Sequence, residues 1–350
     1  MLCGRASRAQ SGEIVFRYIR NPSPAMRKRL FAIGLLKSCS SDINNQIADM
    51  KIIKDVFNII DTMNFEKVLF HGYNSIESLA KILTEYGIDK DEPHYKRILE
   101  LVRQTDNNGA LFTRGITKVG KYVEDKGYSA SVTIKASLLA SSGFDSHPDV
   151  IERIEHSLKC FKAVLDYGSI YDFAVKKSDT WVYKEGKLFP DYYNFRVLAF
   201  SKSWKNVHTI EMMVKAFERL CRLQPIPNVY IPYKGQLIAP GSYLMHEIDT
   251  DFIECNDDKK AEWLIRNEYL ARMGLLRDIN TLKKVNRNLD NVENMIESIK
   301  NIKRPYSFTK WGAYSGISLE NDWRKEERKV NDIAFRIGLI DYYSNLGKSA

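Results

Sequence analysis

The sequence predicts an all-α protein whose central part repeats a helical hairpin. Two stretches share one pattern of apolar residues, glycine and proline: GYNSIESLAKILTEYGIDKDEPHYKRILELV from Gly72, and GYSASVTIKASLLASSGFDSHPDVIERIEHSLKC from Gly127. In both, the apolar residues recur at helical spacing. A heptad pattern from Leu282 to Ile299 adds helix near the C-terminus. We therefore expect an N-terminal helical segment over 1–65, helical-hairpin repeats over 66–235 and a C-terminal helical region over 236–350.

The composition is that of a globular protein able to bury a sizeable core. The chain has 350 residues, of which 44% are hydrophobic and 28% charged. No apolar run approaches the roughly 18 residues that a membrane span needs. The N-terminus has arginines but no continuous apolar stretch, so it does not read as a secretory signal. Five scattered cysteines, never in a CxxC pair, fit reduced thiols better than disulfides or a zinc knuckle. We expect a cytoplasmic protein.

The formal charge of +9 suits an anionic partner, although a dispersed excess of this size also occurs in proteins that have none. The N-terminal stretch RYIRNPSPAMRKRL is the local candidate for phosphate contacts. It clusters five cations, Arg17, Arg20, Arg27, Lys28 and Arg29. A solvated helix start at Ser23 and Pro24 explains the same stretch. Nucleic-acid binding and a plain surface helix both remain open.

The two opening stretches predict helical hairpins with defined ends. Gly87 and Gly143 occupy equivalent places, where a glycine can end the first helix. Pro93 and Pro148 then begin the second helix, because proline has no N–H to lose in a first turn. A more divergent copy starts at Phe189 without the glycine and proline, and Thr209 could cap its second helix.

The stretches between these hairpins predict long loops. They are QTDNNGALFTRG, residues 104–115, and KKSDTWVYKEGKLFP, residues 176–190. With such loops, the hairpin units resemble the prenyltransferase and squalene-cyclase repeats of the terpenoid cyclase superfamily. The resemblance covers about Tyr73 to Tyr233, with a terminal repeat around FTKWGAYSGISLENDWRKEERKVNDIAFRIGLIDYY. It implies an α/α toroid, in which inner helices line a central cavity and the C-terminal region completes the ring.

The chain departs from that superfamily where its chemistry is concerned. Class II cyclases carry an acidic DxDD motif, whereas the nearest stretch here is DTD at Asp249 to Asp251. The prenyltransferases hold zinc with Asp, Cys and His, and the only local mixture of these types is HEIDTDFIEC. Because zinc needs three or four ligands that converge in space, we assign no metal and no cofactor.

Aromatic residues near the starts of the expected inner helices are the candidates for ligand binding. Aromatic faces stabilise a cation at close range, but they also fill an ordinary core. An arginine on an apolar helix needs an anion, either a neighbouring carboxylate or a ligand. The ligand-binding candidates are His71, Tyr73, Tyr128, Tyr192, Phe195, Arg196 and Trp311.

No catalytic residue can be assigned. The weak candidates are Asp191, Asp249, Asp251 and Asp322. Asp322 lies in an aromatic-rich stretch, and a carboxylate beside tryptophan in a pocket can have a raised pKa and act as a general acid. The alternative is that Asp322 charges the start of the last helix.

The heptad pattern consists of apolar residues spaced three and four apart in alternation. They are Leu282, Val285, Leu289, Val292, Ile296 and Ile299. Such a stripe fits an amphipathic helix on the rest of the domain or a homodimer contact.

Three functions follow as hypotheses. The first is a cyclase-like repeat protein that binds an apolar or isoprenoid-like ligand in a central cavity, with catalysis open. The second is a non-catalytic interaction scaffold that uses the heptad helix, and the third is an α-solenoid that binds nucleic acid. P-loop, GxGxxG, HExxH and GxSxG motifs are absent from the sequence, which removes the usual support for the chemistries they serve.

Overall fold

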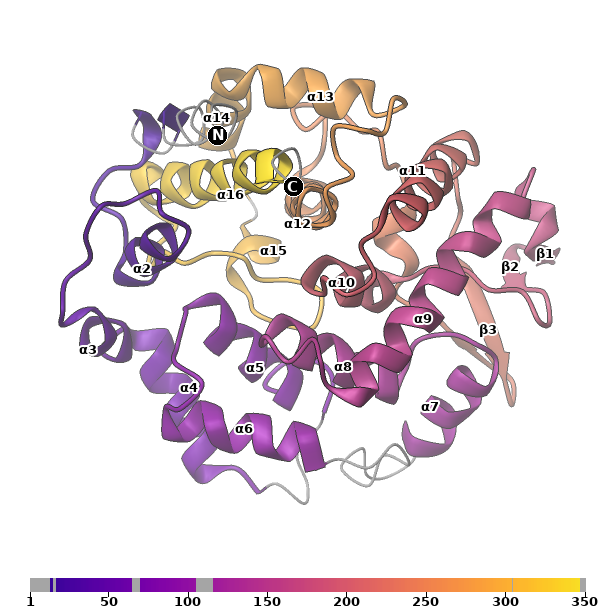
Figure 1. The fold of residues 1–350 in the computed structure, drawn as a ribbon, viewed down its shortest axis with the longest axis horizontal. Coiled ribbons are helices and arrows are strands. Elements are labelled where there is room, and N and C mark those ends of the chain that lie inside the picture. Colours follow the sequence, from indigo (N-terminus) through magenta and orange to yellow (C-terminus); the bar gives the residue numbers. More distant parts are fainter. Residues whose placement is uncertain (1–12, 15–16, 65–69, 105–115, 304, 347–350) are drawn as a thin grey trace. The chain divides into compact units, whose positions relative to one another are not determined.

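The computed structural model describes residues 13–14, 17–64, 70–104, 116–303 and 305–346 (Figure 1). This part of the chain contains fifteen α-helices and a four-stranded sheet. It divides into two compact units. Unit 1 comprises 1–102, 251–274 and 284–350, and unit 2 comprises 103–250 and 275–283. Each unit thus draws on separate stretches of chain, whereas the three predicted segments are consecutive.

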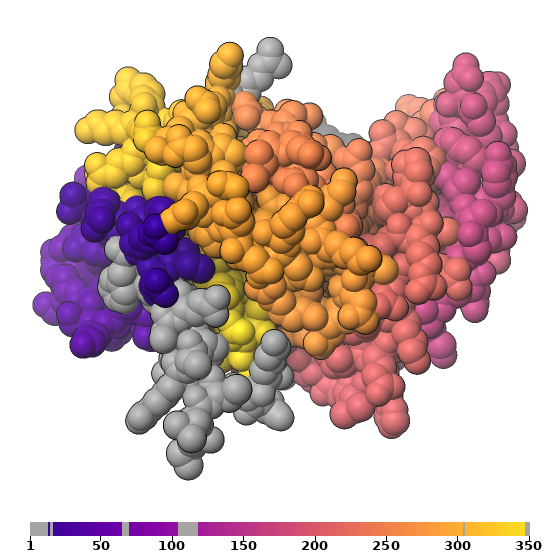
Figure 2. Space-filling model, turned by 90° about the horizontal axis from the view of Figure 1, so that it is seen from above, coloured from indigo at the N-terminus to yellow at the C-terminus, as the bar shows by residue number. Residues whose placement is uncertain are grey.

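Unit 1 is helical in its described residues. Its helices are α2 (Pro24–Ala32), α3 (Ile43–Ala48), α4 (Lys51–Thr62), α5 (Ile76–Glu85), α6 (Pro93–Gln104), α12 (Asp257–Met273), α13 (Lys283–Asp290), α14 (Val292–Lys300), α15 (Tyr306–Thr309) and α16 (Glu326–Leu346). Helix α16 packs against α12 and α14 and is buried on nearly all sides. The Asn331 side chain accepts from Arg20 N and donates to Arg20 O, at 2.8 and 2.7 Å. The N-terminal and C-terminal segments therefore meet in this unit, as Figure 2 shows by the contact of indigo with orange and yellow atoms.

Unit 2 combines helices with the sheet. Its helices are α7 (Ile116–Asp125), α8 (Ser131–Ser141), α9 (Pro148–Ala163), α10 (Tyr192–Phe200) and α11 (Val207–Arg222). Its strands are β1 (Ala174–Lys177), β2 (Thr180–Tyr183), β3 (Val229–Tyr233) and β4 (Gln236–Ile238), and three short 3₁₀ turns are η1 (Val164–Asp166), η2 (Ile170–Asp172) and η3 (Ser242–Met245). Helix α8 packs against α9 and α10, and α9 also contacts α11. These contacts form the helical core of the unit.

The helices expected for the three hairpins are present as α5 and α6, α8 and α9, and α10 and α11. Helix α8 packs against α9, whereas the members of the other two pairs make little contact with each other. Gly87 and Gly143 follow the first helix of the first two pairs with φ of 69° and 81°, the left-handed conformation expected there. Pro93 and Pro148 are the first residues of α6 and α9. The predicted cap at Thr209 is wrong. Asn206 caps α11 instead, because its side chain accepts from Thr209 N at 3.0 Å.

The sheet shows that the all-α prediction, and with it an all-helical toroid, is wrong. Strand order is β1-β2-β3-β4, with antiparallel outer pairs and a parallel pair in the middle. Strand β2 and the end of β1 lie in the stretch 176–190, which the sequence analysis assigned to a loop. Strands of three to five residues are too short to show a period, and the β2–β3 pairing joins segments that are distant in the sequence.

The other predicted loop, 104–115, lies outside the described residues apart from Gln104. The heptad region forms α13 and α14, which are separated by Asn291 with φ of −130° and ψ of 62°. Leu282, Val285 and Ile299 are completely buried within the chain. This burial agrees with the amphipathic-helix interpretation, while a homodimer contact stays a prediction. Over the described stretches, no helix has the length and apolarity required to cross a membrane.

Candidate functional site

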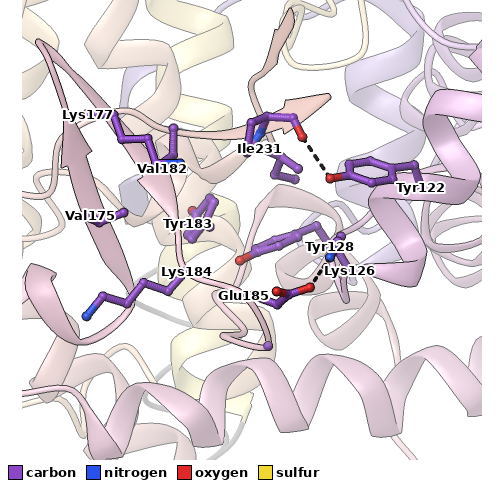
Figure 3. A pocket seen from close by; sticks show the side chains of 12 residues that line it. Tyr122, Lys126, Tyr128, Val175, Lys177, Val182, Tyr183, Lys184, Glu185 and Ile231 are labelled. Atoms are coloured by element: carbon purple, nitrogen blue, oxygen red, sulfur yellow. Dashed lines mark hydrogen bonds and ion pairs between the residues drawn. The ribbon is translucent and has the colours of Figure 1, made fainter. Parts of the chain in front are cut away.

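Unit 2 contains an open pocket between its sheet and the end of α7 (Figure 3). Its volume is about 430 Å³, within the range of small-molecule sites. The lining combines tyrosines, lysines and apolar side chains: Tyr122, Lys126, Tyr128, Val175, Lys177, Val182, Tyr183, Lys184, Glu185, Gly186, Ile231 and Pro232.

The pocket forms where the parallel strand ladder stops. Strands β2 and β3 pair only through Trp181 with Val229 and Val182 with Tyr230. Both strands continue beyond these pairs, and residues 183–186 and 231–232 line the pocket just past them. Helix α7 and the turn after it form the opposite wall of the pocket.

Two tyrosines connect the α7 region to the two separated strands. Tyr122 OH donates to Pro232 O at 2.9 Å, and Tyr128 OH donates to Lys187 O at 2.7 Å. Gly127 makes the turn between them with φ of 83°. A side chain at this position would also meet the end of the Leu188 side chain, which could shift. Glycine is therefore favoured here chiefly by the left-handed backbone conformation.

The tyrosine rings give the pocket an uncharged aromatic wall. The rings of Tyr128 and Tyr183 lie 4.6 Å apart between centroids. Burial raises the pKa of both phenols. Both hydroxyls are therefore protonated at neutral pH. Val182 and Ile231 are buried beside these rings, so an apolar part of a ligand would have a matching surface.

The charged side chains of the pocket leave an excess of positive charge. Its single carboxylate, Glu185, pairs with Lys126 at 2.6 Å. This pair raises the pKa of Lys126 and lowers that of Glu185. The Lys184 ammonium donates to Tyr171 O. Lys177 is exposed and has no ion pair or hydrogen bond from its ammonium group to any residue that the structure describes. An anionic group on a ligand would meet Lys177 without displacing an existing contact.

The arrangement suits binding better than proton transfer. Among the described lining residues, the only carboxyl is that of Glu185, which is exposed, ion-paired and lowered in pKa. A general acid at neutral pH requires a raised carboxyl pKa instead. The pocket therefore offers an apolar wall and an anion site, without a carboxyl tuned for acid catalysis.

Among the predicted ligand-binding residues of unit 2, Tyr128 lines this pocket. Tyr192 and Phe195 are fully buried. Phe195 packs against other rings of the helical core, and Tyr192 stacks on Tyr243. Arg196 is buried and donates to Ser141 Oγ at 3.0 Å. These contacts are those of core packing, and a ligand role for the three buried residues stays a prediction.

The predicted ligand-binding residues of unit 1 have defined partners. His71 Nδ1 lies 2.7 Å from the buried Glu77 carboxylate. Tyr73 is half-exposed, and the Lys310 ammonium lies 4.3 Å from its ring centroid. Trp311 lines a second pocket, which lies in unit 1.

The acidic candidates are occupied by structural roles. Asp191 is the N-cap of α10, where its carboxylate accepts from Tyr193 N and Asn194 N at 2.9 and 3.1 Å. Burial raises the pKa of Asp191, although these backbone donors oppose the shift. Asp251 accepts from Arg287 at 3.1 Å.

The other two acidic candidates are Asp322 and Asp249. Asp322 accepts from the backbone N–H and the side chain of Arg324, which lowers its pKa. It precedes α16, which begins at Glu326. Asp249 is half-buried in unit 2.

The basic residues of the N-terminal stretch make contacts within the protein. Arg17 pairs with Glu293 and Arg29 with Glu85, while Arg27 and Lys28 donate to Gln46 and Asn44. Nucleic-acid binding by this stretch stays a prediction. Within the described ranges, no three His, Cys, Asp or Glu side chains are placed to hold a metal ion.

No protein-family model, curated protein or solved structure matches this chain. The resemblance to the terpenoid cyclase superfamily therefore has no support from these comparisons.

Sequence reasoning missed most of the pocket. Of its lining residues, it selected Tyr128 alone. The signal that could have found the others is TWVY, a run of β-branched and aromatic residues typical of a strand. The lysines that flank this run, Lys177 and Lys184, are brought to one place only by the strand pairing.

Proposed function

We propose that unit 2 binds a small molecule that has an anionic group and an apolar body, such as an isoprenoid phosphate. The observation that carries this proposal is the lining of the 430 Å³ pocket, where tyrosines and apolar side chains adjoin three lysines and a single, already paired carboxylate. The isoprenoid-like ligand expected from the sequence is retained here, but the sheet pocket replaces an all-helical cavity as its site.

The structure suggests how such a ligand would lie. Its anionic group would contact Lys177, whose ammonium has no partner in the described part of the chain. Its apolar body would extend along Tyr128, Val182 and Ile231. Burial of apolar ligand surface would supply most of the affinity, and the lysine would set the preference for an anion.

Two probes that differ only in charge test this proposal. Geranyl phosphate and geraniol share one apolar chain, and ligand-observed NMR can measure the binding of both to the full-length protein. We expect geranyl phosphate to bind more tightly than geraniol. The substitution Lys177→Gln should lower the affinity for geranyl phosphate about threefold, which corresponds to the free-energy contribution of an exposed charge contact. It should leave the affinity for geraniol unchanged.

Strand β1 supplies the matched control. Lys176 is the neighbour of Lys177, is also exposed and does not line the pocket, because successive side chains of a strand point to opposite faces. Lys176→Gln should leave both affinities unchanged. Equal losses from the two substitutions would show a general charge effect and contradict the proposal, as would the absence of binding by both probes.

A further inference from the structure

Unit 1 contains a second pocket, of about 360 Å³, which the proposed function does not use. Its walls come from the first turns of α4, the end of α5 and the segment after α15. The lining residues are Lys51, Ile52, Asp55, Tyr86, Thr309, Trp311, Ser318, Glu320, Asn321 and Trp323. All of them belong to unit 1.

Aromatic rings form one part of this pocket, and their polar atoms are largely engaged with the protein. Tyr86 OH donates to Ser318 O at 3.3 Å, and Trp323 Nε1 donates to the Asp332 carboxylate at 2.6 Å. The ring of Trp311 lies 5.9 Å from that of Tyr86. Aromatic faces attract a cation, and two tryptophans in one lining favour an ammonium group.

A buried carboxylate also belongs to the lining. Glu320 lines the pocket, and its side chain is only 1% exposed. It is held by Arg328 at 2.8 Å and by Ser23 N at 3.1 Å, so its charge is already compensated and a ligand cation would depend on Asp55 instead. Lys81 lies 5.7 Å from the Trp311 ring, but it is not part of the lining. The Lys81 ammonium donates instead to Ser315 O at 3.0 Å.

The rim carries one charge of each sign. Lys51 and Asp55 are exposed, lie one turn apart on α4 and both line the pocket. Neither forms an ion pair with the other or with any residue in the described part of the chain. An organic cation alone would satisfy Asp55 and leave Lys51 repelling it. A molecule that holds both an ammonium group and a carboxylate would satisfy both.

We infer that this pocket binds a small zwitterion, which unites an ammonium group and a carboxylate as a free amino acid or a betaine does. The ammonium group lies against Trp311 and Trp323 with Asp55 beside it, and the carboxylate lies at Lys51. The volume of about 360 Å³ accommodates a molecule of this size. This site is independent of the pocket proposed for unit 2, because the two share no residue.

Three probes test the inference on the full-length protein by ligand-observed NMR titration. Glycine betaine and L-phenylalanine represent the two sources of the zwitterion, and choline carries the trimethylammonium group of betaine without its carboxylate. We expect at least one zwitterion to bind about threefold or more tightly than choline. The tighter of the two identifies the source.

Two rim substitutions separate the charges. Asp55→Asn should lower the binding affinity for the zwitterion and for choline alike, by about threefold. Lys51→Gln should lower the affinity for the zwitterion, because its carboxylate loses a cationic partner. The same substitution should raise the affinity for choline, because a repelling cation is removed. Opposite responses to Lys51→Gln are not expected from a loss of folding, which would lower both affinities.

The control lies on the same helix. Lys54 is exposed, pairs with Asp49 and does not line the pocket, so Lys54→Gln should change no affinity. The inference is overturned if neither zwitterion binds, if choline binds as tightly as both, or if Lys51→Gln and Lys54→Gln have equal effects.

Discussion

The two compact units bury their helices in different ways. Unit 1 buries a chain of alternating charges, in which Arg336 lies between Glu85 at 2.9 Å and Glu268 at 3.1 Å. Arg29 extends the chain from Glu85, and Arg272 extends it from Glu268. Unit 2 instead buries a cluster of aromatic rings where α9, α10 and α11 meet.

The charged chain of unit 1 ties together distant parts of the sequence. Its members lie on α2, α5, α12 and α16. Burial alone would raise the pKa of Glu85, but Arg336, Arg29 and Arg272 together lower it strongly. Each charge therefore depends on its neighbours to compensate for its lost hydration. Such a core accepts few alternative arrangements.

The aromatic cluster of unit 2 imposes a weaker constraint. Phe161, Phe195 and Phe217 approach one another with ring centroids 5.1 to 6.2 Å apart. All three are fully buried and carry no polar group. Rings of this kind can shift and repack after a substitution, because their contacts do not require one exact geometry. The comparison predicts that unit 1 is the less tolerant of single changes.

The largest effect is expected from Arg336→Met. Removal of the central cation leaves two buried carboxylates with fewer partners, which should lower the free energy of opening of α16 by about 4 kcal/mol. Hydrogen exchange of the α12 and α16 amides measures this change. Arg222→Met is the control, because the Arg222 side chain is 63% exposed. A loss below about 1 kcal/mol would show that the charges do not hold unit 1 together.

A somewhat smaller effect is expected from Phe195→Ala in unit 2. Loss of a buried ring costs about 3 kcal/mol when neighbouring rings can move into part of the space. Exchange of the α8 to α11 amides should report it. Tyr171→Ala, at a site that is 63% exposed, should cost less than about 0.5 kcal/mol. If Phe195→Ala destabilises its unit more than Arg336→Met destabilises the other, the comparison fails.

The smallest effect concerns a buried acid of unit 1, Asp332, which forms no ion pair with any residue that the structure describes. Asp332 accepts from Leu319 N, Ser318 Oγ and Trp323 Nε1. Burial raises its pKa to about 6, above the value of 3.8 for an exposed aspartate. Between these two values the folded protein binds a proton that the unfolded chain does not, so this group adds stability as pH falls from 7.5 to 5.

Between pH 7.5 and 5 the free energy of unfolding should rise by about 1 kcal/mol, and Asp332→Asn should abolish this rise. Urea unfolding of the protein and of this variant at pH 5 and 7.5 measures the difference. The variant should also be less stable at both values, because an asparagine amide cannot accept from all the donors that meet the Asp332 carboxylate. An identical pH response in the two proteins would contradict the assignment.

The sequence predicted those features of the fold that depend on a few neighbouring residues, such as the ends of helices. Gly87 and Gly143 end helices, and Pro93 and Pro148 begin them, as their spacing predicted. Glycine tolerates a left-handed backbone, and proline fits a first turn, whatever surrounds them. The apolar stripe from Leu282 to Ile299 likewise predicted helix, although not the break at Asn291.

The candidate site depends on contacts between distant segments, which local sequence patterns do not predict. Tyr128 could be selected as an aromatic, but its neighbours Lys177 and Ile231 come from strands of four and five residues. The roles of the acidic residues could not be read from the sequence either. Asp191 is the N-cap of α10. The buried acid that accepts from Trp323 is Asp332 on α16, and not Asp322.

The sequence by itself thus determined where most helices begin and end, since helical spacing, capping and turn formation act over a few residues. Only the tertiary structure decided that short segments pair into a sheet, which charges are buried together and where pockets open. These features depend on the free energy of contacts between distant segments, and a local sequence pattern does not predict which segments will contact each other.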